Sequence, residues 1–292
     1  MNKLKPLIVL LLLIITSCSE NETKETKETI ETIDPNEPVK ENTKPLIKSI
    51  TEINPSSGSV TTFTYNAFKI KEATTIGTNV GLLKITYSYT EDLITQQNGY
   101  VEDQLYFSTD YTYENNRLKT AIFKHTNSGT IFPAMNQTKY VYNYVSENLV
   151  EIYVYTYSNN DWVPTGSLPQ VKIYFNNSNI IKRERFSSKG LITSTLNYEY
   201  DDKPNIYKNI TGFDKLYFTD SFENVFNRHF DIKDINNSNN VTFFTEQMNS
   251  IYTETKRYSY DLNTDGYPKE KRHHYDNNNV DRYLIEKTFT YY

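Results

Sequence analysis

Cysteine is nearly absent from this chain of 292 residues, because Cys18 is the only one. A single cysteine excludes a disulfide framework within the chain and any metal site that needs a Cys-x-x-Cys pair. Glycine is also scarce, with nine residues, so the turns must rely on Asn, Asp and Ser. The formal net charge of −5 argues against a nucleic-acid-binding protein, which would show a dominant basic surface.

The common signatures of catalysis are absent as well. The sequence contains no HExxH, GxSxG, GxGxxG or P-loop motif. His273 and His274 are neighbours, so on a strand they would point to opposite faces and could not share a metal ion without a bulge. His125 and His229 stand alone in the sequence. We therefore expect no catalytic residues, no cofactor and no metal site, apart from one calcium-loop candidate considered below.

Tyrosine is abundant: 26 Tyr and 15 Phe favour β-strands. Asp110–Phe123 (DYTYENNRLKTAIF) shows a repeating unit with two aromatic residues separated by one, a polar loop of four residues, and then an apolar residue. This unit predicts a hairpin. The second aromatic residue of each unit is its anchor, and the anchors are Tyr65, Tyr89, Tyr113, Tyr144, Phe175, Tyr200, Tyr260, Tyr275 and Tyr291. Their spacing indicates tandem hairpins with outer loops of variable length.

The loop length predicts which residues share a face of each hairpin. A four-residue loop pairs Tyr113 with Leu118 and Tyr111 with Thr120, which leaves Ile122 on the same apolar face. In the next hairpin the pattern predicts two apolar faces that both need cover. One face would hold Tyr140, Tyr142, Leu149, Tyr153, Tyr155 and Tyr157, and the other Val141, Val150, Ile152 and Val154.

The repeat is interrupted between Tyr200 and Tyr260. Asp220–Phe230 (DSFENVFNRHF) predicts a short amphipathic helix, with Asp220 as the N-cap and Glu223 as its capping-box partner. We place a helical insertion near residues 213–232 and expect it to pack on a sheet face that would otherwise be uncovered.

The N-terminus predicts export. Lys3 and Lys5 precede the apolar stretch Leu7–Ile15, which suits a signal peptide and is too short for a transmembrane helix. Residues 15–18 (ITSC) resemble the lipobox of bacterial lipoproteins, in which the cysteine becomes the lipid-carrying N-terminus; an ordinary signal peptide is the alternative. We expect a signal peptide over residues 1–17, then a lipidated Cys18 and a disordered acidic tether over residues 18–44.

Residues 45–292 are expected to form one all-β domain. It would be an antiparallel meander of tandem hairpins in a curved or partly closed sheet, with one short helical insertion. A transmembrane barrel is the competing architecture, suggested by the aromatic C-terminal sequence TFTYY. The charged residues Lys182, Arg183, Glu184 and Arg185 argue against it, because consecutive strand positions would place ions on the lipid-facing surface.

The units loosely resemble the tyrosine-aspartate (YD/RHS-type) repeats of surface toxin shells. The chain more closely resembles a group of Bacteroidota lipoproteins that have a lipobox, an acidic tether and tandem tyrosine hairpins. In that group a YxYDxKxNP-like stretch precedes a helical insertion and an Asn-rich return, and here YEYDDKPNIYKNI (198–210) and NNSNNVT (236–242) match. The resemblance implies an envelope location and a β-fold, and it implies no catalytic residues.

One stretch resembles the start of a calcium-binding loop. Asp261, Asn263 and Asp265 match a DxNxDG pattern, in which alternate oxygens converge on the ion. Arg272, however, occupies the twelfth position, where a glutamate would bind. A hairpin turn with Gly266 in a left-handed conformation is the alternative.

A second stretch is a candidate for ligand contact. Trp162 lies in the loop SNNDWVPTGSLP, where an exposed indole beside amide and acid groups could stack on a sugar. Tyr153 and Tyr155 are further candidate contacts. The alternative is that Trp162 packs back onto the sheet.

These observations predict a lipoprotein of the cell envelope, exported and held by its lipid at the outer membrane, on either the periplasmic or the surface-exposed face. The first expected role is non-enzymatic binding or scaffolding, with a protein or a glycan as partner. A glycan-directed enzyme is one alternative, which would need two carboxylates roughly 5 to 9.5 Å apart. A purely structural envelope component is another.

Overall fold

The computed structural model describes residues 44–53, 58–77, 81–125, 137–216, 237–249, 251–277 and 280–292. The predicted signal peptide, Cys18 and the tether up to residue 43 lie outside these ranges. One 3-10 helix, η1 (Phe213–Lys215), accompanies the strands. The strands are β1 (Ile47–Glu52), β2 (Ser59–Asn66), β3 (Lys69–Gly77), β4 (Gly81–Thr90), β5 (Leu93–Val101), β6 (Gln104–Glu114), β7 (Arg117–His125), β8 (Thr138–Ser146), β9 (Leu149–Ser158), β10 (Asp161–Pro164), β11 (Val171–Asn176), β12 (Asn179–Phe186), β13 (Ile192–Pro204), β14 (Asn239–Met248), β15 (Tyr252–Leu262), β16 (Pro268–Asn277) and β17 (Val280–Tyr291).

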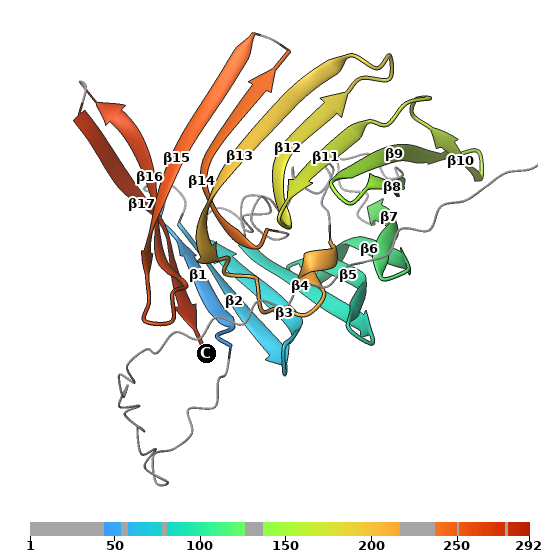
Figure 1. Ribbon diagram of the computed structural model, residues 1–292. Coiled ribbons are helices and arrows are strands. Elements are labelled where there is room, and N and C mark those ends of the chain that lie inside the picture. Colours follow the sequence, from blue (N-terminus) through green and yellow to red (C-terminus); the bar gives the residue numbers. More distant parts are fainter. Residues whose placement is uncertain are drawn as a thin grey trace, which may run out of the picture. The chain divides into compact units, whose positions relative to one another are not determined.

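The strands form one antiparallel meander that closes on itself. Each strand pairs with the next along the chain, except that β10 pairs with β9 and β11 returns to β9 as well. β1 pairs with both β2 and β17, which completes a barrel of 16 strands with β10 as an additional short strand (Figure 1). The expected all-β meander is confirmed, and the expected partly closed sheet is corrected to a closed one. Closure depends on β1, which carries none of the tyrosine pairs that mark the repeats.

The inner face of β1–β9 and β11 is mainly apolar, with a few buried polar residues such as Thr61, Thr75 and Gln97 that are hydrogen-bonded. In β2, for example, Phe63 and Tyr65 point inward while Thr62 and Thr64 point outward. Alternation of this kind along each strand builds one continuous core. Its most deeply buried members include Phe63, Ile70, Ile85, Ile94, Phe107, Leu118, Tyr142 and Ile152.

The inner face of β12–β17 also carries charges. Strand register places Arg183 directly opposite Ile173, so its side chain points inward. Lys271 is buried on β16, where its Nζ lies 4.0 Å from the ring centre of Tyr258 and 3.6 Å from a carboxylate oxygen of Glu286. A cation over a ring face and beside a carboxylate retains favourable electrostatic partners after it leaves water.

The outer face carries many ion pairs. Lys182 and Glu184 point outward while Arg183 points inward, which confirms that the run 182–185 places ions on the outer surface. The hydrogen bond from Lys172 Nζ lowers the pKa of Glu151 below its ordinary value. Other outer pairs are Lys84–Asp103 and Lys124–Asp110.

Six of the anchor tyrosines join consecutive hairpins at one end of the barrel. Tyr113 Oη donates a hydrogen bond of 2.7 Å to the carbonyl of Ile94, the second residue of the preceding return strand. Tyr144 bonds Leu118 in the same way at 3.0 Å. The same type of bond joins Tyr65 to Ile47, Tyr200 to Ile180, Tyr260 to Val241 and Tyr291 to Pro268. Tyrosine suits these anchor positions because its ring fills the core and its hydroxyl satisfies a carbonyl of the neighbouring hairpin.

Replacing Tyr113 with phenylalanine tests this link. The substitution keeps the ring and leaves the Ile94 carbonyl without its partner, so we expect a loss of about 1 kcal/mol in the free energy of unfolding. Thermal and urea unfolding would measure it. Tyr157→Phe is the control, because Tyr157 is exposed on the opposite face. An equal effect of the two substitutions would contradict the proposed role of the anchor hydroxyl.

β-Bulges shift the register of the hairpins. Tyr113 pairs with Leu118 as expected, but the turn between β6 and β7 contains two residues, and Tyr111 pairs with Ala121 instead of Thr120. The shift between Thr112 and Tyr113 moves Ile122 to the outer face, so its predicted position was wrong. One extra residue on one strand is enough to exchange the faces of everything beyond it.

The same effect corrects the β8–β9 hairpin. A register shift between Tyr144 and Ser146 pairs Tyr142 with Ile152. The inner face therefore holds Tyr140, Tyr142, Val150, Ile152 and Val154, and the outer face holds Val141, Tyr153, Tyr155 and Tyr157. The prediction had assigned Val150, Ile152 and Val154 to the face opposite Tyr140 and Tyr142.

Residues 205–216, here called the mouth segment, follow β13 and contribute to the barrel core. Five of their apolar side chains are buried: Ile206, Tyr207, Ile210, Phe213 and Leu216. The Thr211 amide donates to the Phe68 carbonyl in the β2–β3 turn, and Tyr89 Oη donates to the Thr211 carbonyl. The segment therefore packs at the barrel end where the anchor hairpins turn. The predicted helix at 220–230 lies outside the described residues.

Asparagine and aspartate side chains hold the chain on either side of this insertion. Asn240 Nδ2 donates to both carboxylate oxygens of Asp201, at 3.3 and 3.1 Å. Asn179 Oδ1 accepts hydrogen bonds from the amides of Ser238 and Asn239. The sequence motifs at 198–210 and 236–242 thus have a structural role, because they fasten the exit and the return of the insertion to neighbouring strands.

Candidate functional site

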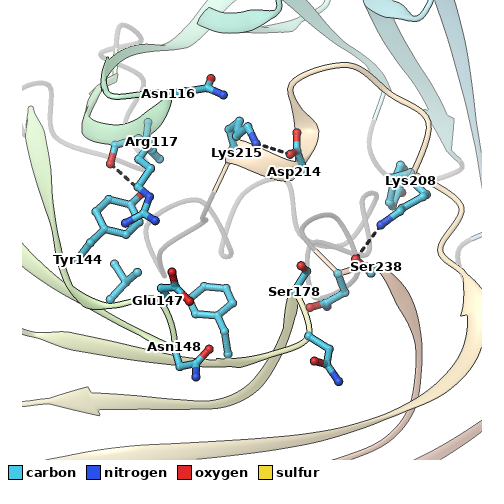
Figure 2. A pocket seen from close by; sticks show the side chains of 16 residues that line it. Asn116, Arg117, Tyr144, Glu147, Asn148, Ser178, Lys208, Asp214, Lys215 and Ser238 are labelled. Atoms are coloured by element: carbon cyan, nitrogen blue, oxygen red, sulfur yellow. Dashed lines mark hydrogen bonds and ion pairs between the residues drawn. The ribbon is translucent and has the colours of Figure 1, made fainter. Parts of the chain in front are cut away.

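A pocket of about 590 Å³ opens at the barrel end that bears the mouth segment. The turns of three hairpins, β6–β7, β8–β9 and β11–β12, form one side of it, and the mouth segment with residues 237–238 forms the other (Figure 2). We call it the mouth pocket. Its volume lies within the range of ordinary small-molecule sites.

The floor of the mouth pocket is apolar. Leu118, Val150 and Tyr207 line it and are almost fully buried. The ring of Tyr144 forms part of the wall, and the guanidinium carbon of Arg117 lies 5.2 Å from its ring centre. Tyr144 is fixed from below by its hydrogen bond to the Leu118 carbonyl. The aromatic wall is therefore rigidly held before any ligand arrives.

The rim supplies amides and hydroxyls. Asn116 and Asn177 have positive φ angles of 60° and 48°, which tight hairpin turns require and asparagine tolerates well. The hairpin turns lie around the opening of the pocket, and they place these asparagine side chains there. The complete set of amide and hydroxyl residues on the rim is Asn116, Asn148, Asn177, Ser178, Asn237 and Ser238.

Charged groups of both signs complete the lining. Lys215 Nζ forms an ion pair of 2.6 Å with Asp214, and Lys208 Nζ donates to Ser238 Oγ at 2.8 Å. Figure 2 shows these two pairs on the side of the pocket opposite Glu147. With Arg117, the lining holds three cations and two carboxylates. Surface charges of this kind orient a polar ligand but add little affinity individually.

This arrangement is suited to holding a polar, hydroxyl-rich molecule. Each asparagine amide both donates and accepts hydrogen bonds, as each sugar hydroxyl does. The ring faces and the apolar floor can cover the CH-rich face of such a molecule. Glu147 and Asp214 are the carboxylates present, and Asp214 is already paired with Lys215. Within the described ranges, no three His, Cys, Asp or Glu side chains lie close enough to hold a metal ion.

Trp162, Tyr153 and Tyr155 lie together on the outer face, away from the mouth pocket. Trp162 belongs to β10 and packs edge-on against Tyr157, with ring centres 5.2 Å apart. Lys139 Nζ lies 4.8 Å from the Trp162 ring and 4.9 Å from the Tyr155 ring. The indole is half-buried by these contacts. A role of the three residues in ligand binding stays a prediction.

Asp261, Asn263 and Asp265 lie in the β15–β16 connection. Asn263 Oδ1 accepts hydrogen bonds from the backbone amides of Asp265 and Tyr267. Asp261 Oδ2 pairs with Arg272 at 2.6 Å, and Gly266 adopts a φ of 80°. The oxygens that calcium would need thus serve a hairpin turn and an ion pair in this structure.

Sequence reasoning did not identify the residues of the mouth pocket individually. It did single out the Tyr144 hairpin, through its two predicted apolar faces, and the interruption of the repeat after Tyr200. Both contribute to the pocket, through Tyr144 and through Tyr207 and Lys208. The remaining signal was the asparagine content of the turns, which turn geometry alone already explains.

Comparisons with known proteins support the fold. A crystal structure of a porin-like protein from Bacteroides vulgatus ATCC 8482 is similar, with a TM-score of 0.54, 12% sequence identity, and coverage of 85% of this chain and 99% of that chain. A porin-like protein from Bacteroides uniformis ATCC 8492 gives a TM-score of 0.48 at 14% identity, covering 84% and 96% of the two chains. No protein-family model and no curated protein matches the sequence. Among the described residues, no helix is long and apolar enough to cross a membrane.

Proposed function

We propose that this chain is a lipid-anchored β-barrel of the cell envelope that binds a saccharide in the mouth pocket without cleaving it. The observation that carries the proposal is the convergence of amide side chains from several hairpin turns around an aromatic and apolar floor. The barrel fixes the relative positions of these turns, so the site loses little conformational entropy when a ligand binds.

The envelope location rests on two observations. The sequence ITSC at residues 15–18 has the pattern of a lipidation site, and the fold resembles that of porin-like proteins. The outer face carries ion pairs such as Lys172–Glu151, which would be costly in contact with lipid chains. We therefore propose that the lipid on Cys18, and not a spanning barrel, holds the protein at the membrane. The resemblance to Bacteroidota lipoproteins supports the same assignment.

Glycan-array screening followed by titration calorimetry would test the binding function. The lipid-free chain from residue 19 should bind at least one oligosaccharide. Asn148→Ala and Lys208→Ala should each weaken binding about tenfold, which corresponds to the loss of about one hydrogen bond. Lys119→Ala is the matched control, because Lys119 pairs with Glu114 on the outer face. Full affinity in both pocket variants, or no binding to any glycan, would contradict the proposal.

The same bound saccharide distinguishes binding from catalysis. We expect it to be recovered intact after long incubation with the protein. Release of shorter products that stops in both Glu147→Gln and Asp214→Asn would establish the enzymatic alternative instead.

A further inference from the structure

Three neighbouring hairpins carry exposed apolar residues at the barrel end opposite the mouth pocket. They are the β12–β13, β14–β15 and β16–β17 hairpins, and their ends lie on the side of the barrel away from η1 (Figure 1). Ile251 is 92% exposed, Leu191 67% and Leu284 57%. We call these residues the apolar tips, together with their exposed neighbours Ile192, Met248, Tyr252, Val280 and Tyr283.

The tips project beyond the packed part of the barrel. Tyr283 and Leu284 are consecutive on β17, so they point to opposite faces of the sheet, and more than half of each side chain is exposed. A strand packed against a core would bury one of the two. Both faces of this hairpin are therefore available to an apolar environment.

Charge differs between the three hairpins: Lys189 lies in the β12–β13 turn, acidic residues flank the β16–β17 turn, and the β14–β15 tip is uncharged. Residues 247–253 (QMNSIYT) contain no charged side chain. On the β16–β17 hairpin, Asp276 and Asp281 lie beside the turn, and Arg257 pairs with them at 3.0 and 3.3 Å. Tyr252 and Tyr283 lie close to the apolar residues. The uncharged β14–β15 tip, where Ile251 is followed by Tyr252, combines the aliphatic and aromatic side chains that favour a bilayer interface.

We propose that the apolar tips insert into the headgroup region of a lipid bilayer. The location rests on the proposed function, because a lipid on Cys18 would place the chain beside a membrane. β1 begins at the other end of the barrel, but the 26 residues from Ser19 to Lys44 span up to about 90 Å when extended. Even the longest strand, with 13 residues, extends only about 45 Å. The tips and the lipid can therefore reach the same membrane surface.

Vesicle co-sedimentation of the lipid-free chain from residue 19 tests the proposal. With vesicles of phosphatidylethanolamine and phosphatidylglycerol, the chain should partition measurably, and Ile251→Asp should reduce the partition coefficient at least tenfold. The substitution should not affect folding, because Ile251 is almost fully exposed. Val145→Asp is the matched control, since Val145 is 54% exposed at the opposite end of the barrel.

A fluorescence measurement provides a second readout. Ile251→Trp in a Trp162→Phe background places one indole at a tip, and its emission should shift to shorter wavelength when vesicles are added. No shift, or equal partition of Ile251→Asp and the unmodified chain, would overturn the proposal. So would a dimer that Ile251→Asp dissociates while vesicle binding is unchanged, because the tips would then join two copies. Saccharide binding at the mouth pocket is independent of these outcomes, so the two proposals can fail separately.

Discussion

Raising the pH from 9 to 11.5 is expected to unfold this protein cooperatively, with most buried tyrosines ionising in that same transition. Burial raises the pKa of Tyr111 and Tyr142 well above the ordinary value, and neighbouring phenols raise it further. Burial also raises the pKa of Tyr65, Tyr87 and Tyr291. The core that stabilises the barrel at neutral pH therefore makes it sensitive to alkali.

The upward shift of these pKa values determines that stability falls as the pH rises. A phenol whose pKa is higher in the folded state contributes its full stability below pH 10, the pKa of an unfolded tyrosine, and loses that contribution as the pH rises toward the folded value. At pH 11 the ionised form of an unfolded tyrosine outnumbers the neutral form by about ten to one. This favours unfolding by about 1.4 kcal/mol for each phenol that stays neutral in the barrel. Tyr111 and Tyr142 together would remove about 3 kcal/mol, a large part of a typical stability of 5–15 kcal/mol.

Absorbance at 295 nm reports tyrosinate and circular dichroism reports the sheet, so both should change in one step. Gradual ionisation of all 26 tyrosines near pH 10 with an intact sheet would contradict the burial described here.

The tyrosine repeat predicted the hairpins well because its information is local. The distance from Tyr113 to Leu118 determines a pairing across a single turn, and that pairing is present. The β-bulge between Thr112 and Tyr113 was not predictable, because it leaves no mark on the residue types or on the spacing of the repeat. Its consequence is large, since it decides that Ala121 and not Ile122 faces the core.

Closure of the barrel and the position of the pocket depend on long-range contacts. β1 joins β17 across almost the whole described chain, and no periodic pattern in residues 47–52 identifies these partners. The mouth pocket likewise combines turns around residues 116, 148 and 178 with residues near 208 and 238. Sequence could indicate where the repeat is interrupted, but only the folded barrel shows that these interruptions meet.

The two ends of the barrel differ because the repeat controls only one of them. Anchor hydroxyls tie the turns at the mouth to one another, and two of those turns are the tight ones that contain Asn116 and Asn177. A rim of short, linked turns is preorganised for a small ligand. At the opposite end the β12–β13 and β14–β15 hairpins are joined by backbone pairing instead, as in the bond of 2.9 Å from the Asn249 amide to the Thr193 carbonyl.

Gly99→Ala is expected to destabilise the barrel by about 2 kcal/mol, because the Phe107 ring occupies the space that a Cβ would need. Gly99 lies on the inner face of β5 directly opposite Phe107 of β6. A Cβ built on Gly99 would lie 2.0 Å from Phe107 Cε1 and 2.5 Å from Cδ1. Phe107 is 1% exposed and packs against Phe123 with ring centres 5.5 Å apart, so it cannot move aside without disturbing the core.

A double-mutant cycle separates this steric effect from general strand propensity. Phe107→Leu should itself destabilise the protein by about 1–2 kcal/mol, since it removes buried ring atoms. In the Phe107→Leu background, Gly99→Ala should be close to neutral, which gives a coupling energy of more than about 1 kcal/mol. Ser108→Ala, at the neighbouring outward position of β6, is the control and should change stability by less than about 0.5 kcal/mol. Additive effects of Gly99→Ala and Phe107→Leu would show that the ring does not occupy the space above Gly99.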